Sequence, residues 1–307
     1  MKTFDDALNY LISQAIPTIK TQQVNIGLAL GKTLAENIVA KVDVPAHDNS
    51  MMDGYALNVE NLKNRQVFSV SQRIAAGDVG QTLTNNTLAR IFTGAPIPKG
   101  ANAVIMQEET EQNGDEILIT ALKTKAGQNI RVIGEDIAKN SIILNKGHKL
   151  RAQDLGLISS IGIAKVTVYK PLTIATFTSG NELLEPGEKL QEGKIYNANR
   201  YVLAGIIPQL GFELIDLGTV EDTLEATIEA MSQAAKVADI VITTGGVSVG
   251  EEDHIKPAIE HLGSLDLWKV KMKPGKPLAF GNIKGVPFIG LPGNPVSAFA
   301  TFMLFAR

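Results

Sequence analysis

A glycine-rich loop carries the strongest chemical signal in this sequence. The strand-like run 238–242 is followed by residues 243–253, which read TTGGVSVGEED, and then by a helix-like segment that ends near Leu262. A loop of small residues between a strand and a helix leaves several backbone N–H groups free to point at one anion, and the helix dipole adds partial positive charge there. The loop is typical of a phosphate site, and it is equally compatible with a purely structural turn.

Acidic residues end this loop. Glu251, Glu252 and Asp253 would repel a bare phosphate unless a divalent cation lies between the carboxylates and the phosphate. The pattern therefore predicts a phosphorylated ligand that binds together with a metal ion.

Three more loops are expected at the same place. Strand-like runs alternate with helical patterns at residues 172–177, 212–217, 240–243 and 287–291. This alternation predicts βαβ units and a mostly parallel sheet, and ligands of such sheets bind at the carboxyl ends of the strands. Glu182, Asp222 and residues 292–295 (PGNP) each follow one of these strands, so we expect them to converge with the glycine-rich loop. Three of the four loops bring oxygen ligands of the kind that Mg²⁺ prefers.

Two other segments could bind an anion. Asn294 can cap a helix that begins at Pro295, although a capped core helix explains these residues as well. Residues 268–273 alternate, so Trp268, Val270 and Met272 are predicted to face the core, with the lysines at 269, 271 and 273 on the other face. Lys273 and Lys276 flank a Pro-Gly turn, which suits the binding of an oxyanion.

The pattern along the chain predicts a multi-domain α/β protein. A helix over 3–16 and another over 152–161 belong to an interrupted N-terminal α+β domain, residues 1–41 and 136–168. Short β-branched runs broken by Gly, Asn and Pro indicate a β-rich domain inserted at 42–135, with a hairpin turn at Asn113-Gly114. Residues 169–307 form the third domain, a three-layer α/β domain with the mostly parallel sheet.

Composition narrows the class of function. The chain has 307 residues, 44% of them hydrophobic and 20% charged, which is ordinary for a soluble globular protein. A net charge of −3 argues against nucleic acid as a partner, and no apolar run is long enough for a membrane helix. The N-terminus lacks the basic-then-apolar pattern of a signal peptide, so we expect a cytoplasmic protein. There is no cysteine, so a substrate of any sulfur chemistry must bring its own sulfur.

Taken together in order, seven segments resemble those of the molybdopterin molybdenumtransferase family, which includes the C-terminal domain of gephyrin. The segments are DNSMMDGYAL, RIFTGAPIPKGANAVIMQEE, GQNIRVIGEDI, IYNANR, ITTGGVSVGEEDH, KMKPGKP and GLPGNPVSA. No single segment is decisive, but the ordered set covers nearly the whole chain.

The resemblance implies a specific reaction. The family binds adenylylated molybdopterin, uses molybdate and a divalent cation such as Mg²⁺, releases AMP, and leaves molybdenum on the dithiolene of the pterin. It also implies a homodimer in which the β-rich domain of one subunit reaches the α/β domain of the other. Other proteins of molybdenum-cofactor biosynthesis are possible partners.

The resemblance also implies a set of site residues. Asp53 and Thr93 would come from one subunit, and Asp136 matches a further active-site position. The other subunit would supply Glu182, Asp222, Asp253, Lys273, Lys276 and Ser297. The cation would be held by three negatively charged residues, Asp222, Asp253 and Glu182. Molybdate would be bound by Lys273 and Lys276, or these lysines would stabilise the negative charge that develops as the phosphoanhydride breaks. The ligand itself would be cradled by Gly245, Gly246, Ser248, Gly250, Pro292, Gly293, Asn294 and Ser297.

The sequence departs from the family pattern in places, and two other functions stay open. Asn181 stands where the family has an aspartate, which removes one negative charge near the expected cation. The family continues with another small β-rich domain, which this sequence is expected to lack because it ends at Arg307 within an apolar helical pattern. The alternatives are an enzyme similar to molybdopterin adenylyltransferase, which lacks the β-rich insertion, and a non-catalytic scaffold or inactive paralogue.

Overall fold

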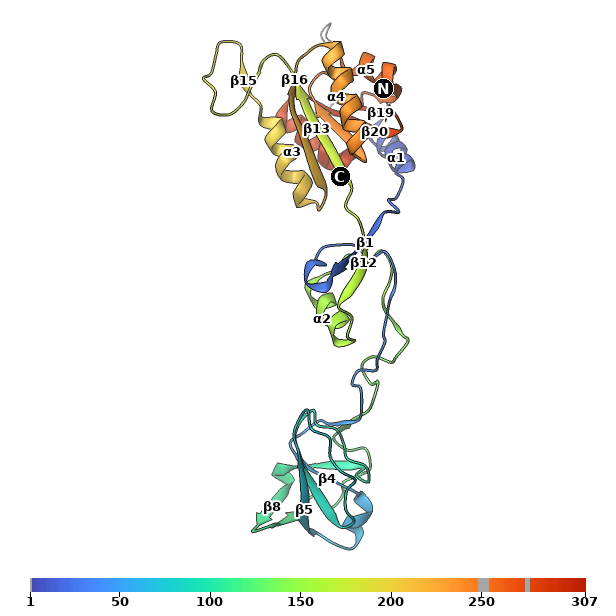
Figure 1. Cartoon of the computed structure of the whole chain (residues 1–307), viewed down its shortest axis with the longest axis vertical. Coiled ribbons are helices and arrows are strands. Elements are labelled where there is room, and N and C mark those ends of the chain that lie inside the picture. Colours follow the sequence, from blue (N-terminus) through green and yellow to red (C-terminus); the bar gives the residue numbers. More distant parts are fainter. Residues whose placement is uncertain (1, 248–253, 274–276) are drawn as a thin grey trace. The chain divides into compact units, whose positions relative to one another are not determined.

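A computed structural model describes residues 2–247, 254–273 and 277–307 (Figure 1). The chain divides into two compact units. One consists of Met1–Thr21 and Tyr169–Arg307, and the other of Gln22–Val168. We call them the α/β unit and the β-rich unit, and each is described by itself.

A six-stranded sheet forms the centre of the α/β unit. Its strands lie in the order β16 (Glu213–Val220), β13 (Thr173–Ser179), β17 (Ile240–Thr244), β20 (Val286–Leu291), β19 (Ala279–Ile283) and β18 (Gly263–Trp268). The first four are parallel, and β19 and β18 continue the sheet antiparallel. The four parallel strands match the four runs that alternate with helical patterns in the sequence, so the predicted α/β fold is confirmed.

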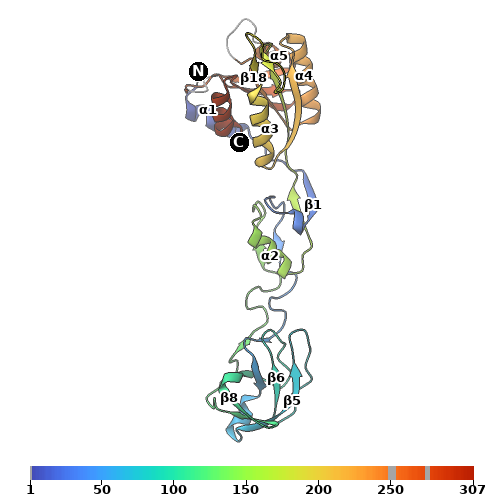
Figure 2. The same ribbon diagram turned by 90° about the vertical axis from the view of Figure 1, so that its left-hand side faces the viewer.

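Helices cover both faces of this sheet (Figures 1 and 2). Neighbouring residues of each strand point to opposite faces, so Ile174, Ile242 and Ile289 lie in one core while Ala175, Val241 and Phe288 lie in the other. The first core is closed by α1 (Phe4–Gln14), α3 (Ala198–Gln209) and α6 (Pro295–Thr301), and the second by α4 (Leu224–Val237) and α5 (Ile255–Leu262). The result is the three-layer arrangement that the sequence predicts.

The N-terminal helix packs on the α/β unit, whereas the sequence pattern placed it with residues 136–168. Thr3 caps it as expected, because its hydroxyl accepts a hydrogen bond from the N–H of Asp6 at 3.2 Å. Ala7 and Leu11 are buried against the sheet, and the ring of Phe4 lies 5.2 Å from that of Phe305. An amphipathic stripe shows that a helix needs a core, but it does not show which one.

The segment after β18 also differs from the expected alternation. Lys269 has a left-handed backbone, with φ of 73°, and β18 ends at Trp268. Trp268 therefore packs in the core that α4 and α5 cover, while Val270 and Met272 pack in the core on the other face of the sheet. A single residue with positive φ breaks the two-residue period on which the prediction rested.

The β-rich unit contains three separate sets of buried side chains. Two of them lie on opposite faces of a six-stranded sheet of β7 (Ala103–Met106), β4 (Gly54–Leu57), β6 (Thr87–Ile91), β5 (Val67–Ile74), β9 (Glu116–Ile119) and β8 (Thr110–Asn113). The predicted hairpin forms between β8 and β9, but its turn residues are Gly114 and Asp115, because Asn113 is the last residue of β8 and pairs with Glu116. The third set packs around α2 (Ala152–Ser160), β12 (Lys165–Tyr169), β1 (Thr21–Asn25), β2 (Ile38–Val39) and β11 (Ile142–Leu144). The expected domain boundaries at residues 42 and 135 stay a prediction. No helix in the described part of the chain is long and apolar enough to cross a membrane.

A buried carboxylate begins α2 and gives the β-rich unit a pH-dependent stability. The side chain of Asp154 is 4% exposed, and its Oδ2 accepts hydrogen bonds from the backbone N–H of Arg151 at 2.8 Å and from Arg151 Nε at 3.0 Å. His148 Nε2 lies 2.7 Å from the same oxygen. The hydrogen bonds from the Arg151 side chain and the His148 ring hold the pKa of Asp154 well below its usual range.

We expect Asp154→Asn to lower the free energy of unfolding of this unit by about 1–2 kcal/mol at neutral pH, because asparagine carries no negative charge and its NH2 group cannot accept the hydrogen bond that Arg151 Nη2 donates to Oδ1 at 3.1 Å. The folded pKa lies below the unfolded one, so the wild-type advantage is complete above about pH 5 and is lost as the pH falls through and below about 4. Hydrogen exchange of the α2 amides in urea would measure the free energy of unfolding of both proteins across this pH range. Asp115→Asn in the exposed hairpin is the control, and an effect equal to that control would contradict the prediction.

Candidate active site

A pocket of about 310 Å³ lies at the carboxyl ends of three parallel strands of the α/β unit. Ser179 ends β13, Thr244 ends β17, and Gly293 and Asn294 follow β20. The pocket is lined by Ser179, Glu182, Leu183, Ile195, Tyr196, Asn197, Ala198, Asn199, Thr244, Gly245, Gly293, Asn294 and Pro295. It therefore joins Glu182, Gly245, Gly293 and Asn294, which the sequence places on three separate loops.

Two glycines shape this pocket through their backbones. Gly245 has φ of 90°, and a Cβ at this position would lie 2.7 Å from the carbonyl oxygen of Ser179. Gly180 has φ of 146°, and a Cβ there would lie 2.6 Å from Glu182 Oε2. At Gly245 both the positive φ and the nearby backbone oxygen require glycine, so the loop after β17 can pack closely against the end of β13. At Gly180 the positive φ favours glycine, and the close neighbour is the flexible carboxylate of Glu182.

Asn199 fixes the loop after β20. Its Nδ2 donates a hydrogen bond to the carbonyl oxygen of Gly293 at 2.7 Å. Its Oδ1 is buried and has no hydrogen-bond partner within the described residues. Asn294 in turn accepts a hydrogen bond from the N–H of Ser297 at 3.2 Å and caps α6, as the sequence predicts. The motif IYNANR contains Asn199, but no role for its side chain follows from the motif alone.

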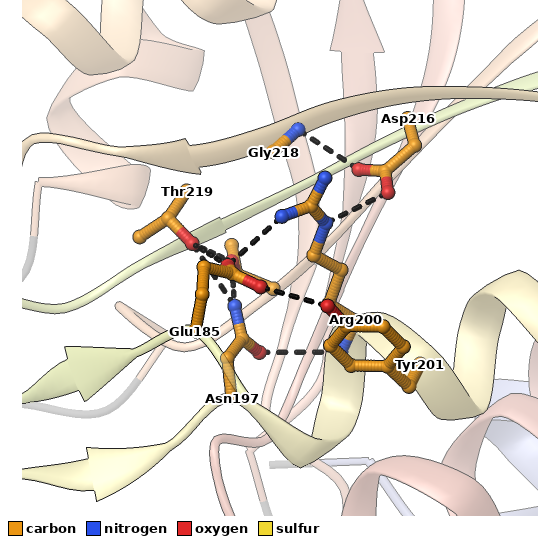
Figure 3. A network of polar contacts seen from close by, with 8 residues as sticks. Glu185, Asn197, Arg200, Tyr201, Asp216, Gly218 and Thr219 are labelled. Atoms are coloured by element: carbon orange, nitrogen blue, oxygen red, sulfur yellow. Dashed lines mark hydrogen bonds and ion pairs between the residues drawn. The ribbon is translucent and has the colours of Figure 1, made fainter. Parts of the chain in front are cut away.

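A polar network connects the start of α3 with β13, β16 and the loop after β14 (Leu183–Leu184), which carries Glu185 (Figure 3). Arg200 lies at its centre, with Nη1 2.9 Å from Glu185 Oε1 and Nε 2.7 Å from Asp216 Oδ2. Glu185 also accepts hydrogen bonds from the hydroxyls of Tyr201 and Thr219, each at 3.0 Å. Burial raises the pKa of Glu185, but the hydrogen bonds from Arg200, Tyr201 and Thr219 outweigh burial and leave this pKa below its ordinary value.

The buried side chain of Asn197 also belongs to this network. Its Nδ2 donates to Thr178 Oγ1 at 2.8 Å and to Thr219 Oγ1 at 3.0 Å, and its Oδ1 accepts from the N–H of Arg200 at 3.2 Å. Glu185 lies three residues after Glu182, and Thr219 lies three residues before Asp222. The network therefore holds together the two chain segments that lead to the two acids of the predicted site.

The other predicted residues of the α/β unit fall into three groups. Asp222 follows β16 at the same edge of the sheet, Gly246 follows Gly245, and Pro292 and Ser297 are buried beside the pocket residues of the β20–α6 loop. Lys273 is exposed and does not line the pocket. The remaining predictions, Ser248, Gly250, Asp253 and Lys276, lie outside the described residues.

In the β-rich unit, Asp53 and Thr93 are hydrogen-bonded to each other, and their place in one active site stays a prediction. The backbone N–H and the hydroxyl of Thr93 both donate to Asp53 Oδ1, at 2.8 and 2.7 Å. The same two hydrogen bonds, the backbone one first, lower the pKa of Asp53. Asp136 forms an ion pair with Arg131 on the exposed surface of this unit.

Replacing Thr93 with valine should raise the pKa of Asp53 part of the way to its ordinary value. Valine keeps the shape and the backbone N–H but removes the hydroxyl that donates to Oδ1. A carboxyl ¹³C NMR titration of Asp53 would measure the change. Thr93→Ser keeps a hydroxyl and is the matched control, so an identical pKa in the two variants would contradict a role for the hydroxyl.

The Glu182 carboxylate is a suitable ligand for a divalent cation, but the described residues hold only part of such a site. Within 2–247, 254–273 and 277–307, no three or more His, Cys, Asp or Glu side chains are grouped so that they could bind a metal. Glu182 is the one acidic residue in the lining of the pocket within this described part. Hard oxygen donors of this kind fit Mg²⁺.

Two protein families match the chain. The MoeA N-terminal region, domains I and II, matches residues 2–162, and the probable molybdopterin binding domain matches residues 175–307. Together these two matches span both compact units.

Relatives with curated names and relatives of known structure indicate the same family. The molybdopterin molybdenumtransferase of Haemophilus influenzae is 41% identical over 303 residues, which cover 98% of this chain and 75% of that protein. The molybdopterin molybdenumtransferase 2 of Mycobacterium tuberculosis is 33% identical over 309 residues, 97% of this chain and 76% of that protein. The crystal structure of a molybdopterin biosynthesis MoeA protein from Pyrococcus horikoshii has a TM-score of 0.88 and 33% identity, covering 99% of this chain and 78% of that one.

Proposed function

The chain belongs to the molybdopterin molybdenumtransferase family of enzymes, and we propose that it transfers molybdenum from molybdate to adenylylated molybdopterin with release of AMP. One observation carries the proposal. Glu182, Gly245, Gly293 and Asn294 line a single pocket at the carboxyl ends of parallel strands. Backbone amides and a helix N-cap suit a phosphoanhydride, and a carboxylate beside them suits the cation that accompanies such a group.

In this proposal each group of site residues has its own role. The loops at Gly245 and Gly293 would hold the phosphates, with Gly246, Pro292 and Ser297 supporting their backbones. Glu182 and Asp222 would bind a divalent cation together with Asp253. The phosphate-binding loop would be completed by Ser248 and Gly250. When bound, the cation would neutralise the charge on the phosphates as the phosphoanhydride is cleaved. Lys273 and Lys276 would bind molybdate, and we expect the reaction to take place in the cytoplasm.

We further propose that the active form is a homodimer. The hydrogen-bonded pair Asp53 and Thr93 is a polar, pre-ordered surface feature of the β-rich unit, and it would contribute to the site of the other copy together with Asp136. Mixing Asp53→Asn and Asp222→Asn chains should then restore activity that neither has alone, because each mixed dimer contains one intact site. The absence of any recovery, with subunit exchange shown by mass, would count against shared sites.

The reaction is tested by AMP release from adenylylated molybdopterin, measured with Mg²⁺ and with or without molybdate. Molybdate-dependent release that stops on chelation of the divalent cation is the expected result. Release that is independent of molybdate would point to hydrolysis, and formation of adenylylated molybdopterin from ATP would favour the adenylyltransferase alternative. Binding of the substrate without any AMP release would favour the non-catalytic alternative.

A further inference from the structure

Arg90 lies close to the pair Asp53 and Thr93 in the β-rich unit, and no role for its side chain follows from the motif RIFTGAPIP that contains it. In the registers of the sheet, Arg90 of β6 lies opposite Tyr55 of β4 and opposite Arg73 of β5. Thr93 follows in the loop after β6. The strand that carries Arg90 therefore leads directly to one member of the pair.

The Arg90 guanidinium contacts two aromatic rings. Its Cζ lies 4.7 Å from the centre of the Phe92 ring and 5.1 Å from that of the Tyr55 ring. Both distances are within the range of about 6 Å in which a cation is attracted to the face of a ring. The side chain of Tyr55 belongs to the buried core of the sheet. Because Phe92 immediately precedes Thr93, Arg90 connects the backbone at Thr93 with this core.

The same guanidinium holds the turn that carries Asp53. Its Nη1 donates a hydrogen bond to the carbonyl oxygen of Gly54 at 3.1 Å, and its Nη2 donates to Gln107 Oε1 at 2.6 Å. The backbone N–H of Gln107 in turn donates to the carbonyl oxygen of Asp53 at 3.0 Å. A planar guanidinium can make both hydrogen bonds at once and still contact the rings. Arg90 is therefore joined to the Asp53 backbone through Gly54 and through Gln107.

The charge of Arg90 also acts on Asp53. The backbone and side-chain hydrogen bonds from Thr93 are the main causes that lower the pKa of Asp53, and the positive charge of Arg90 lowers it further. Thr93 contacts the carboxylate itself, whereas Arg90 contacts Gly54 and Gln107 beside it. The two residues thus have different roles, because Thr93 binds the carboxylate and Arg90 holds the turn that carries it.

We propose that Arg90 is a positioning residue that holds Asp53 and Thr93 in the geometry that the transfer reaction requires. This inference rests on the proposed function, because that function gives the pair its place in the active site. It adds a specific requirement for a guanidinium at position 90. A lysine would keep the positive charge, but its single ammonium group lacks the planar fork that reaches both Gly54 and Gln107.

The first test follows the pair itself by NMR in the full chain. Arg90→Met keeps an apolar stem beside Phe92 but removes the charge and both hydrogen bonds. The backbone N–H of Thr93 should then exchange with solvent about tenfold faster, because its hydrogen bond to Asp53 is no longer held in place. Arg90→Lys should also give faster exchange than the wild type, which separates the guanidinium fork from the charge.

Arg73→Met is the matched control. Arg73 lies opposite Arg90 in the sheet and 4.4 Å from the Phe92 ring, but within the described residues it makes no hydrogen bond to Gly54 or Gln107. Its replacement should leave the exchange of Thr93 within about twofold of the wild type. Gln107→Leu removes only the acceptor of Nη2, so it should also speed the exchange. It decides the question if thermal unfolding shows that Arg90→Met does not fold.

The second test is the steady-state rate of AMP release. Arg90→Met should lower kcat about tenfold and change KM by less than about twofold, because a displaced Asp53 affects the transition state more than the bound substrate. Arg73→Met should keep both constants within about twofold of the wild type. A rise in KM with unchanged kcat would assign Arg90 to substrate binding and overturn the inference.

The NMR and kinetic results separate this inference from the proposed function. Unchanged Thr93 exchange in Arg90→Met, or in Gln107→Leu if the former does not fold, would overturn the role of Arg90. Wild-type exchange in Arg90→Lys would show that a charge alone is enough and would remove the requirement for a guanidinium. Faster exchange with unchanged kcat would show that the position of the pair does not matter to the reaction. An absence of AMP release from the wild type would instead overturn the proposed function.

Discussion

Replacing Asp222 with asparagine should lower the rate of AMP release by at least about 100-fold and leave the fold intact. The change removes one negative charge and almost no volume, at the end of β16 beside the strand whose loop carries Glu182. If Asp222 helps to hold the cation, the variant binds the cation more weakly, and the negative charge that develops on the phosphates is no longer neutralised. Loss of such electrostatic stabilisation of the transition state is among the largest single effects on enzyme rates.

The neighbouring residue provides a matched control for this prediction. Glu221 is exposed and lies one position earlier, so Glu221→Gln removes the same charge from nearly the same place. We expect that variant to stay within about twofold of the wild type. A readout apart from activity is Mn²⁺ binding followed by electron paramagnetic resonance, which should weaken in Asp222→Asn alone. Full AMP release by Asp222→Asn would remove Asp222 from the metal site.

Part of the site could be predicted because a general rule of sheet topology places it. Once strands alternate with helices, the residues after the strands must meet at one edge, and Glu182, Gly245 and Gly293 do line one pocket. The cap at Asn294 was equally predictable, since it depends only on the residue and the proline that follows. These features are local, or they follow from the order of elements alone.

Other features could not be predicted because they depend on pairs of residues from different elements. The sequence contains Glu185, Arg200 and Asp216, but nothing in their spacing shows that one guanidinium contacts both carboxylates. The position of α1 is a similar case, since its apolar stripe fits either unit until the packing is known. A pocket of about 590 Å³ that is lined by Tyr196 and Tyr201 also forms only where α3 and the loop after β14 come together.

Arg200→Met should lower the free energy of unfolding of the α/β unit by about 2–3 kcal/mol at neutral pH. Glu185 and Asp216 are 31% and 26% exposed, so two partly buried carboxylates would lose the cation between them. In the wild type the pKa of Glu185 is below its ordinary value, so this stabilisation is complete above about pH 5 and is lost as the pH falls below about 4. The difference between the two proteins should shrink in the same range.

The single tryptophan makes this measurement specific. Trp268 ends β18, so its fluorescence during urea unfolding reports on the α/β unit rather than on the β-rich unit. Arg200→Lys keeps a charge but cannot contact both carboxylates in the same way, and it should lie between wild type and Arg200→Met. Lys256→Met breaks an exposed pair with Glu260 at 3.9 Å and should cost less than about 0.5 kcal/mol. If Arg200→Met unfolds like Lys256→Met, the network does not hold the two acid-bearing segments together, and the position of Glu182 and Asp222 must depend on the sheet alone.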